Sequence, residues 1–130
     1  MWNNGTGGYG VPHIVLIVED DAATLAGWAA YVHAAGFSVV PLSSFAEAHR
    51  LLPFARPDVL VTDIRLGEYN GLQLVGQAAT LDPPPFVIVT SGFDDPVLAA
   101  EAERMGATFV RKPVEPEQLI ALISGMVKPW

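Results

Sequence analysis

Residues 14–21 read IVLIVEDD, and this stretch decides the fold. Its five leading residues are all apolar and mostly β-branched, which predicts a short strand buried on both faces, as in a parallel sheet. Three acidic residues follow at once, so the strand carries Glu19, Asp20 and Asp21 to its carboxyl end. Asp21 is also well placed to cap a following helix.

The same unit, a short apolar run followed by a helical pattern, recurs along the rest of the chain. We expect further strands at 38–42, 59–62, 86–90 and 108–111. We expect helices at 22–35, 44–52, 71–81, 95–105 and 115–127, with Ser44 as a cap and with Pro53 and Pro57 closing the second helix. Five alternating strand–helix units predict an α/β domain with a parallel sheet and helices on both faces.

Polar residues follow four of the five predicted strands. Besides the acids after the first strand, Asp63 ends the third, Thr90 the fourth and Lys112 follows the fifth. In such sheets, function lies beyond the carboxyl ends of the strands. If strands one and three are neighbours, three carboxylates crowd together and repel one another unless a cation intervenes. Ligands that are all oxygen atoms select Mg²⁺, or Mn²⁺ as a second choice.

These groups together suit the transfer of a phosphoryl group onto Asp63. A carboxylate nucleophile, a divalent cation, the Lys112 ammonium and the Thr90 hydroxyl are the parts that this reaction needs. Taken singly, each residue has a plainer explanation as a helix cap, a turn residue or a solvated side chain. The plainer explanations do not account for all of these residues together, because unrelated polar residues would be scattered over both edges of the sheet.

The composition of the chain limits the classes of protein to which it can belong. The chain has 130 residues, 51% of them apolar and 16% charged, which fits one globular domain, and it lacks cysteine. The formal charge of −7 argues against a nucleic-acid surface. No apolar run could span a membrane and no export signal is visible, so we expect a cytoplasmic protein. We predict a flexible tail over residues 1–12 and a domain over 13–128.

The sequence resembles the receiver domain of two-component response regulators, the CheY-like family. The resemblance runs from Ile14 to Val127 and rests on four segments in order: IVLIVEDD, DVLVTDIRLGEYNGLQL, FVIVTSG and ATFVRKPVEP. It implies a flavodoxin-like, doubly wound fold with strand order 2-1-3-4-5. It also implies that Asp63 is the phosphoacceptor, that Thr90 and Lys112 contact the phosphoryl group, and that Lys112–Pro113 is cis.

The resemblance further implies metal binding by Glu19, Asp20, Asp63 and the backbone carbonyl of Arg65. It implies a switch made of Thr90 and Phe109. It also implies that the residues at two positions, here Arg65 and Gly92, control how readily water reaches the phosphoryl group. Of these two, we expect Arg65 to shield the phosphoryl group and Gly92 to leave access open. Gly67 stands where proline is usual, so we expect a mobile loop there.

For partners, the resemblance implies a sensor histidine kinase or a phosphotransfer protein as donor, and an unknown downstream protein as target. The last two helices and the fifth strand would form the surface that contacts the target. One such contact would be a homodimer that forms on phosphorylation. The chain ends directly after the last predicted helix. We therefore expect either a stand-alone regulator or a receiver from a longer regulator or hybrid kinase.

Three other functions compete with a phosphorylation switch. A haloacid-dehalogenase-type phosphatase would need a carboxylate where Arg65 stands, and a flavodoxin-like cofactor binder would need a phosphate-cradling loop where the acids stand. A receiver-shaped module that no longer switches is disfavoured because every chemical position is filled. We therefore expect a regulatory domain that is not an enzyme in the usual sense.

Overall fold

The apolar runs form one parallel sheet of five strands in the computed structural model, which describes residues 11–94 and 96–127. The strands are β1 (Ile14–Val18), β2 (Ser38–Leu42), β3 (Val59–Asp63), β6 (Phe86–Ser91) and β7 (Thr108–Arg111). Their order is β2-β1-β3-β6-β7. Counting only these strands, this is the expected order 2-1-3-4-5, so β1 and β3 are neighbours as the site requires.

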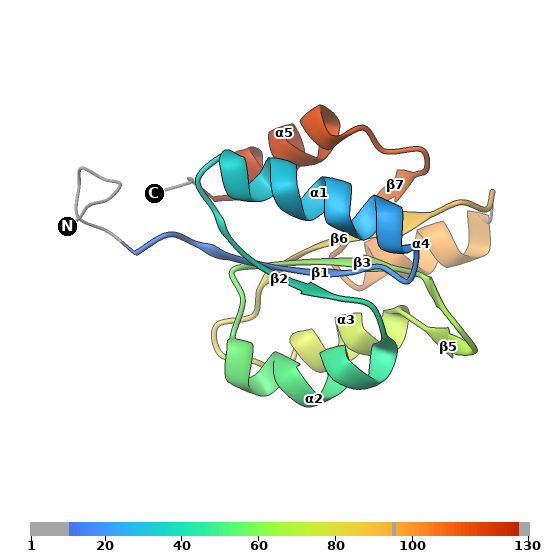
Figure 1. Ribbon diagram of the computed structural model, residues 1–130. Coiled ribbons are helices and arrows are strands. Elements are labelled where there is room, and N and C mark those ends of the chain that lie inside the picture. The colour runs from blue at the N-terminus through green and yellow to red at the C-terminus, as the bar shows by residue number, and fades with distance from the viewer. Residues whose placement is uncertain (1–10, 95, 128–130) are drawn as a thin grey trace.

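Five helices cover the two faces of the sheet (Figure 1). One face carries α1 (Ala22–Ala34) and α5 (Pro116–Met126), and the other carries α2 (Phe45–Ala55), α3 (Leu72–Ala78) and α4 (Pro96–Arg104). The predicted caps of the first two helices are confirmed. Thr24 N donates to Asp21 Oδ2 at 2.9 Å, and Glu47 N donates to Ser44 Oγ at 3.2 Å.

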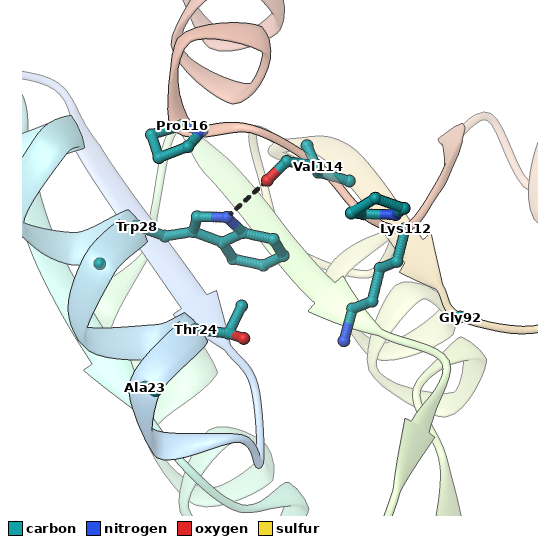
Figure 2. Close-up of a pocket in the computed structure, with 9 residues that line it drawn as sticks. Ala23, Thr24, Trp28, Gly92, Lys112, Val114 and Pro116 are labelled. Atoms are coloured by element: carbon teal, nitrogen blue, oxygen red, sulfur yellow. Dashed lines mark hydrogen bonds between the residues drawn. The ribbon is translucent and has the colours of Figure 1, made fainter.

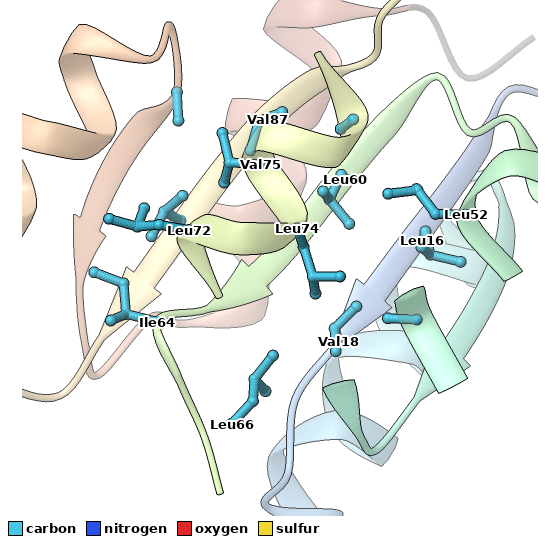
Figure 3. Close-up of a cluster of buried hydrophobic side chains, with 14 of the residues drawn as sticks. Leu16, Val18, Leu52, Leu60, Ile64, Leu66, Leu72, Leu74, Val75 and Val87 are labelled. Atoms are coloured by element: carbon cyan, nitrogen blue, oxygen red, sulfur yellow. The ribbon is translucent and has the colours of Figure 1, made fainter. Parts of the chain in front are cut away.

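The central strands are buried on both faces, as their sequence predicted. Alternate residues point to opposite sides, so Leu16 and Leu60 join the cluster beneath α2 and α3 (Figure 3), while Ile17 and Val61 join the cluster beneath α1 and α5. All four of these side chains have no exposed surface. Burying one such side chain contributes roughly 1.5–3 kcal/mol, and this burial holds the two helical layers on the sheet.

Two helices end three residues away from the expected position. The helix capped by Ser44 continues through Pro53 to Ala55, and its C-cap is Arg56, whose φ of 45° is left-handed. Pro53 lies in the last turn, where its missing N–H removes only one helical bond, while Arg56 N still donates to Leu52 O at 3.2 Å. The helix predicted over 71–81 is shorter, because beyond Ala78 the chain makes tighter turns of the i→i+3 type.

A small hairpin after β3 was not predicted. Strands β4 (Arg65–Leu66) and β5 (Tyr69–Asn70) pair antiparallel across a two-residue turn at Gly67 and Glu68. Gly67 has a φ of 63°, which a glycine at the first central position of a tight hairpin turn adopts without strain. Sequence patterns missed the hairpin because two-residue strands are too short to show any periodicity. The greater mobility expected at Gly67 stays a prediction.

Some predictions fall on residues outside the described ranges. These are most of the tail predicted over 1–12, Asp95 as the start of a helix, and the chain end at 128–130. Within the described ranges, no helix is both long and apolar enough to cross a bilayer.

Candidate functional site

The carboxyl edge of the sheet gathers the predicted site residues. Asp63 and Thr90 lie side by side at the ends of β3 and β6. Glu19 and Lys112 follow β1 and β7, and both extend the strand ladder by one bond, with Glu19 N donating to Leu42 O at 3.0 Å and Lys112 N to Ser91 O at 2.8 Å. The position of each side chain is therefore set by rigid strand backbone.

Lys112 bridges two of the carboxylates. Its Nζ lies 2.6 Å from Glu19 Oε1 and 2.9 Å from Asp63 Oδ2. The Lys112–Pro113 peptide is cis, as the resemblance implied. One ammonium between two carboxylates lowers their mutual repulsion and leaves a net negative charge, which a cation can offset further.

Three carboxylates are close enough to share a metal ion. Oxygen atoms of Glu19, Asp20 and Asp63 all lie within 4.8 Å of one another. Glu19 and Asp63 are buried and Asp20 is exposed, so a cation held here would keep contact with water. Oxygen donors with partial access to solvent suit Mg²⁺, which retains several waters. The residues present therefore fit the ion that their sequence pattern implied.

Burial and hydrogen bonding act in opposite directions on the charged groups. Burial raises the pKa of the Glu19 carboxyl above its usual value, although hydrogen bonds from Lys112 and the Asp21 N–H counteract it. Burial alone would lower the pKa of Lys112, but its hydrogen bonds to Glu19 and Asp63 outweigh this and raise it. Lys112 is therefore a permanent cation at neutral pH.

Thr90 carries an unused hydroxyl at this edge. Its residue has no exposed surface, and within 11–94 and 96–127 its Oγ1 is buried without a hydrogen-bond partner. A buried hydroxyl without a partner costs about 1–3 kcal/mol, so its presence calls for a ligand or a second conformation that satisfies it. Phe109 lies on the adjacent strand β7, half-buried against the cluster beneath α2 and α3.

Arg65 follows Asp63 by two residues, and Gly92 directly follows β6. Arg65 N lies 3.3 Å from Asp63 Oδ1, and its guanidinium stacks over the ring of Phe93 at 4.2 Å. A Cβ at Gly92 would meet nothing within 4 Å. Sequence reasoning missed Phe93, because no local pattern shows that β4 and the loop after β6 place these side chains face to face.

Gly71 sets the backbone of Asp63. A Cβ at Gly71 would lie 1.9 Å from Asp63 O, and Gly71 N donates to Ile64 O at 2.6 Å. The sequence showed Asn70-Gly71 at the spacing of the resemblance, but only the close backbone approach explains why glycine stands there.

Comparisons with known proteins agree with this geometry. Residues 15–124 match the model of the response regulator receiver domain. The transcriptional regulatory protein GlrR of Escherichia coli K12 is 30% identical over 113 residues, which cover 86% of this chain and 26% of that protein. The transcriptional regulatory protein FixJ of Bradyrhizobium diazoefficiens is 27% identical over 115 residues, covering 88% and 56% respectively. The chain thus spans only a quarter to about half of the length of these regulators.

Among solved structures, a CheY-like receiver domain protein from Methanospirillum hungatei superposes with a TM-score of 0.83 at 24% identity. The match covers 88% of this chain and 93% of that one. At this identity the likeness concerns the fold, and it extends over nearly all of the described residues.

Proposed function

Since the chain belongs to the family of response regulator receiver domains, we propose that it is a phosphorylation-dependent signalling switch whose phosphoacceptor is Asp63. The observation that carries this proposal is the Lys112 ammonium in contact with both Glu19 and Asp63, beside three carboxylates that can share one cation. The domain would run over 13–128, slightly beyond the matched residues.

Each side chain has a defined part in the proposed reaction. The Asp63 carboxylate attacks phosphorus, and Lys112 holds an oxygen of the arriving phosphoryl group through its fixed charge. Glu19, Asp20, Asp63 and the Arg65 carbonyl would hold Mg²⁺, or Mn²⁺ in its place. The bound ion supplies a Lewis acid that offsets negative charge on the phosphoryl oxygens.

Thr90 and Phe109 are proposed to convert phosphorylation into a change of shape. The Thr90 Oγ1 has no hydrogen-bond partner among the described residues, so it gives up no hydrogen bond to them by turning toward a phosphoryl oxygen on Asp63. We propose that this movement would leave room beside β7 for the ring of Phe109, which is half-buried. Phosphorylation adds up to two negative charges and strong acceptors, which is enough to bias two packings that differ by a few kcal/mol.

The partners follow from the family. We propose that a sensor histidine kinase or a phosphotransfer protein donates the phosphoryl group, and that a downstream protein reads the α4–β7–α5 face, with dimerisation through that face as one output. Cytoplasmic location stays a prediction, as does the choice between a stand-alone regulator and part of a longer protein.

The test is a change in intact mass. Incubation with acetyl phosphate and Mg²⁺ should add one phosphoryl group to the wild-type chain. Asp63→Ala should gain no phosphoryl group. The control is Asp58→Ala, which should react as the wild type does. Asp58 lies at the opposite edge of the sheet, where its side chain accepts a hydrogen bond from Ile14 N. Undiminished labelling of Asp63→Ala would overturn the assignment. Steady release of phosphate from an ester substrate would instead favour a phosphatase.

A further inference from the structure

A cavity of about 520 Å³ lies beside the phosphorylation site, between the start of α1 and the segment that joins β7 to α5. Figure 2 shows Thr24 and Trp28 on α1 facing Lys112, Val114 and Pro116 across it. This volume is within the range of small-molecule sites in proteins. Its lining combines apolar side chains with one cation.

The wall formed by Trp28 is rigid. Its side chain is almost wholly buried, and its indole Nε1 donates to the Val114 carbonyl at 3.0 Å. The hydrogen-bonding group of the indole is thus already used. Trp28 therefore offers the cavity only a narrow strip of apolar surface, and the more exposed Ala23, Pro113 and Pro116 supply the rest of the apolar lining.

Lys112 connects the cavity to the proposed phosphoacceptor. Lys112 lines it, and Lys112 Nζ lies 5.9 Å from the centre of the Trp28 ring and 2.9 Å from Asp63 Oδ2. A molecule whose anionic end reaches Lys112 can therefore extend its apolar end into the apolar part of the cavity beside Trp28. Gly92, also part of the lining, adds no side chain on that side.

We propose that this cavity holds the leaving group of small-molecule phosphoryl donors, and that it favours aryl acyl phosphates over acetyl phosphate. The inference rests on the proposed function and adds a substrate preference to it. With benzoyl phosphate, an Asp63 carboxylate oxygen forms a bond to phosphorus as the bond from phosphorus to the acyl oxygen breaks. The electron pair leaves on that oxygen, benzoate is released, and no proton is transferred.

Gly27 keeps the cavity open. It lies on α1 in the lining, and a Cβ built there would meet nothing within 4 Å. A side chain at this position therefore begins in open space, and the leucine of Gly27→Leu should occupy part of the cavity. Gly125 on α5 has the same open surroundings and does not line the cavity, so Gly125→Leu is a matched control.

The experiment measures rate constants for phosphorylation of each variant by benzoyl and acetyl phosphate, with Mg²⁺, from intact mass. We expect Gly27→Leu to lower the ratio of benzoyl to acetyl rates by about tenfold, as expected from lost burial of one aromatic ring. Gly27→Ala should lower it less, and Gly125→Leu should leave it unchanged. Comparing ratios between variants cancels the different intrinsic reactivity of the donors.

The outcomes separate the two proposals. Absence of reaction with either donor in the wild-type protein refutes the proposed function itself. Normal reaction with both donors and an unchanged ratio in Gly27→Leu and Gly27→Ala refutes only the leaving-group cavity, and leaves this surface for contact with a protein partner.

A measurement on the wild-type chain tests the proposal without relying on the folding of any variant. Phenylphosphonate should shift the NMR signal of the Trp28 indole N–H in a saturable manner, whereas methylphosphonate should not. Equal behaviour of the two phosphonates would also contradict the proposal.

Discussion

The substitution Gly71→Ala provides the sharpest test of how the site is built. Gly71 has a φ of −60° and a ψ of −18°, which any residue adopts, and it stands at the start of α3. The lower conformational entropy of alanine in the unfolded chain alone therefore predicts a stabilisation of about 0.4–1 kcal/mol at this position. The tertiary structure predicts the opposite sign.

The magnitude follows from one close approach. The added Cβ would lie 1.9 Å from Asp63 O, whereas real Cβ contacts essentially never fall below 3.0 Å, so the two segments must separate by at least 3.0 − 1.9 = 1.1 Å. Both segments are backbone, and Gly71 N is bonded to Ile64 O, so neither yields easily. We expect a loss of about 3 kcal/mol in the free energy of unfolding, at the upper end for overpacking. For a domain of this size it lowers Tm by about 10 °C.

The assay is thermal unfolding together with phosphorylation by acetyl phosphate. Gly71→Ala should unfold at lower temperature and react more slowly, because the Asp63 backbone is displaced from Lys112. The matched control is Gly76→Ala within α3, where the nearest atom, Met105 Cε, is 3.8 Å away and a small stabilisation is expected. If Gly71→Ala unfolds and reacts as the wild type does, the close approach at Asp63 is not a constraint and the reasoning is refuted.

Three further predictions concern the surroundings of the site. Arg65→Ala should speed loss of the phosphoryl group from Asp63, since it removes the shielding side chain held by Phe93; an unchanged decay of the phosphorylated mass refutes shielding. Chelation of divalent cations with EDTA should abolish labelling by acetyl phosphate, and labelling that persists would show that the carboxylates need no metal. Hydrogen bonds from the Thr24 hydroxyl and N–H lower the pKa of Asp21 in the folded state, so its stabilising effect is present above its unfolded pKa and is lost as pH falls through the folded one. Asp21→Asn should therefore show a smaller loss of unfolding free energy on acidification below about pH 4 in denaturant titrations, and an identical acid dependence would contradict this role.

Much of the fold could be predicted from local patterns. The five strands appear where the apolar runs stand, with ends that agree to within one residue, because burial on both faces demands uninterrupted apolar sequence. The ends of the helices were predicted less accurately than the ends of the strands. Pro53 was expected to end a helix and does not, because a proline in a last turn removes only one bond.

The sequence by itself determined the fold class and the edge of the sheet to which Glu19, Asp63, Thr90 and Lys112 belong. Both follow from periodicity and from the parallel direction of the strands, which are local properties of the chain. Only the tertiary structure decided what these groups touch. Lys112 reaches Glu19 across 93 positions of sequence, and Trp28 meets Val114 across 86. Contacts at such separations depend on the twist of the sheet and the paths of loops, which no local pattern encodes. The clash at Gly71, the stack of Arg65 on Phe93 and the cavity beside Lys112 all arise in this way.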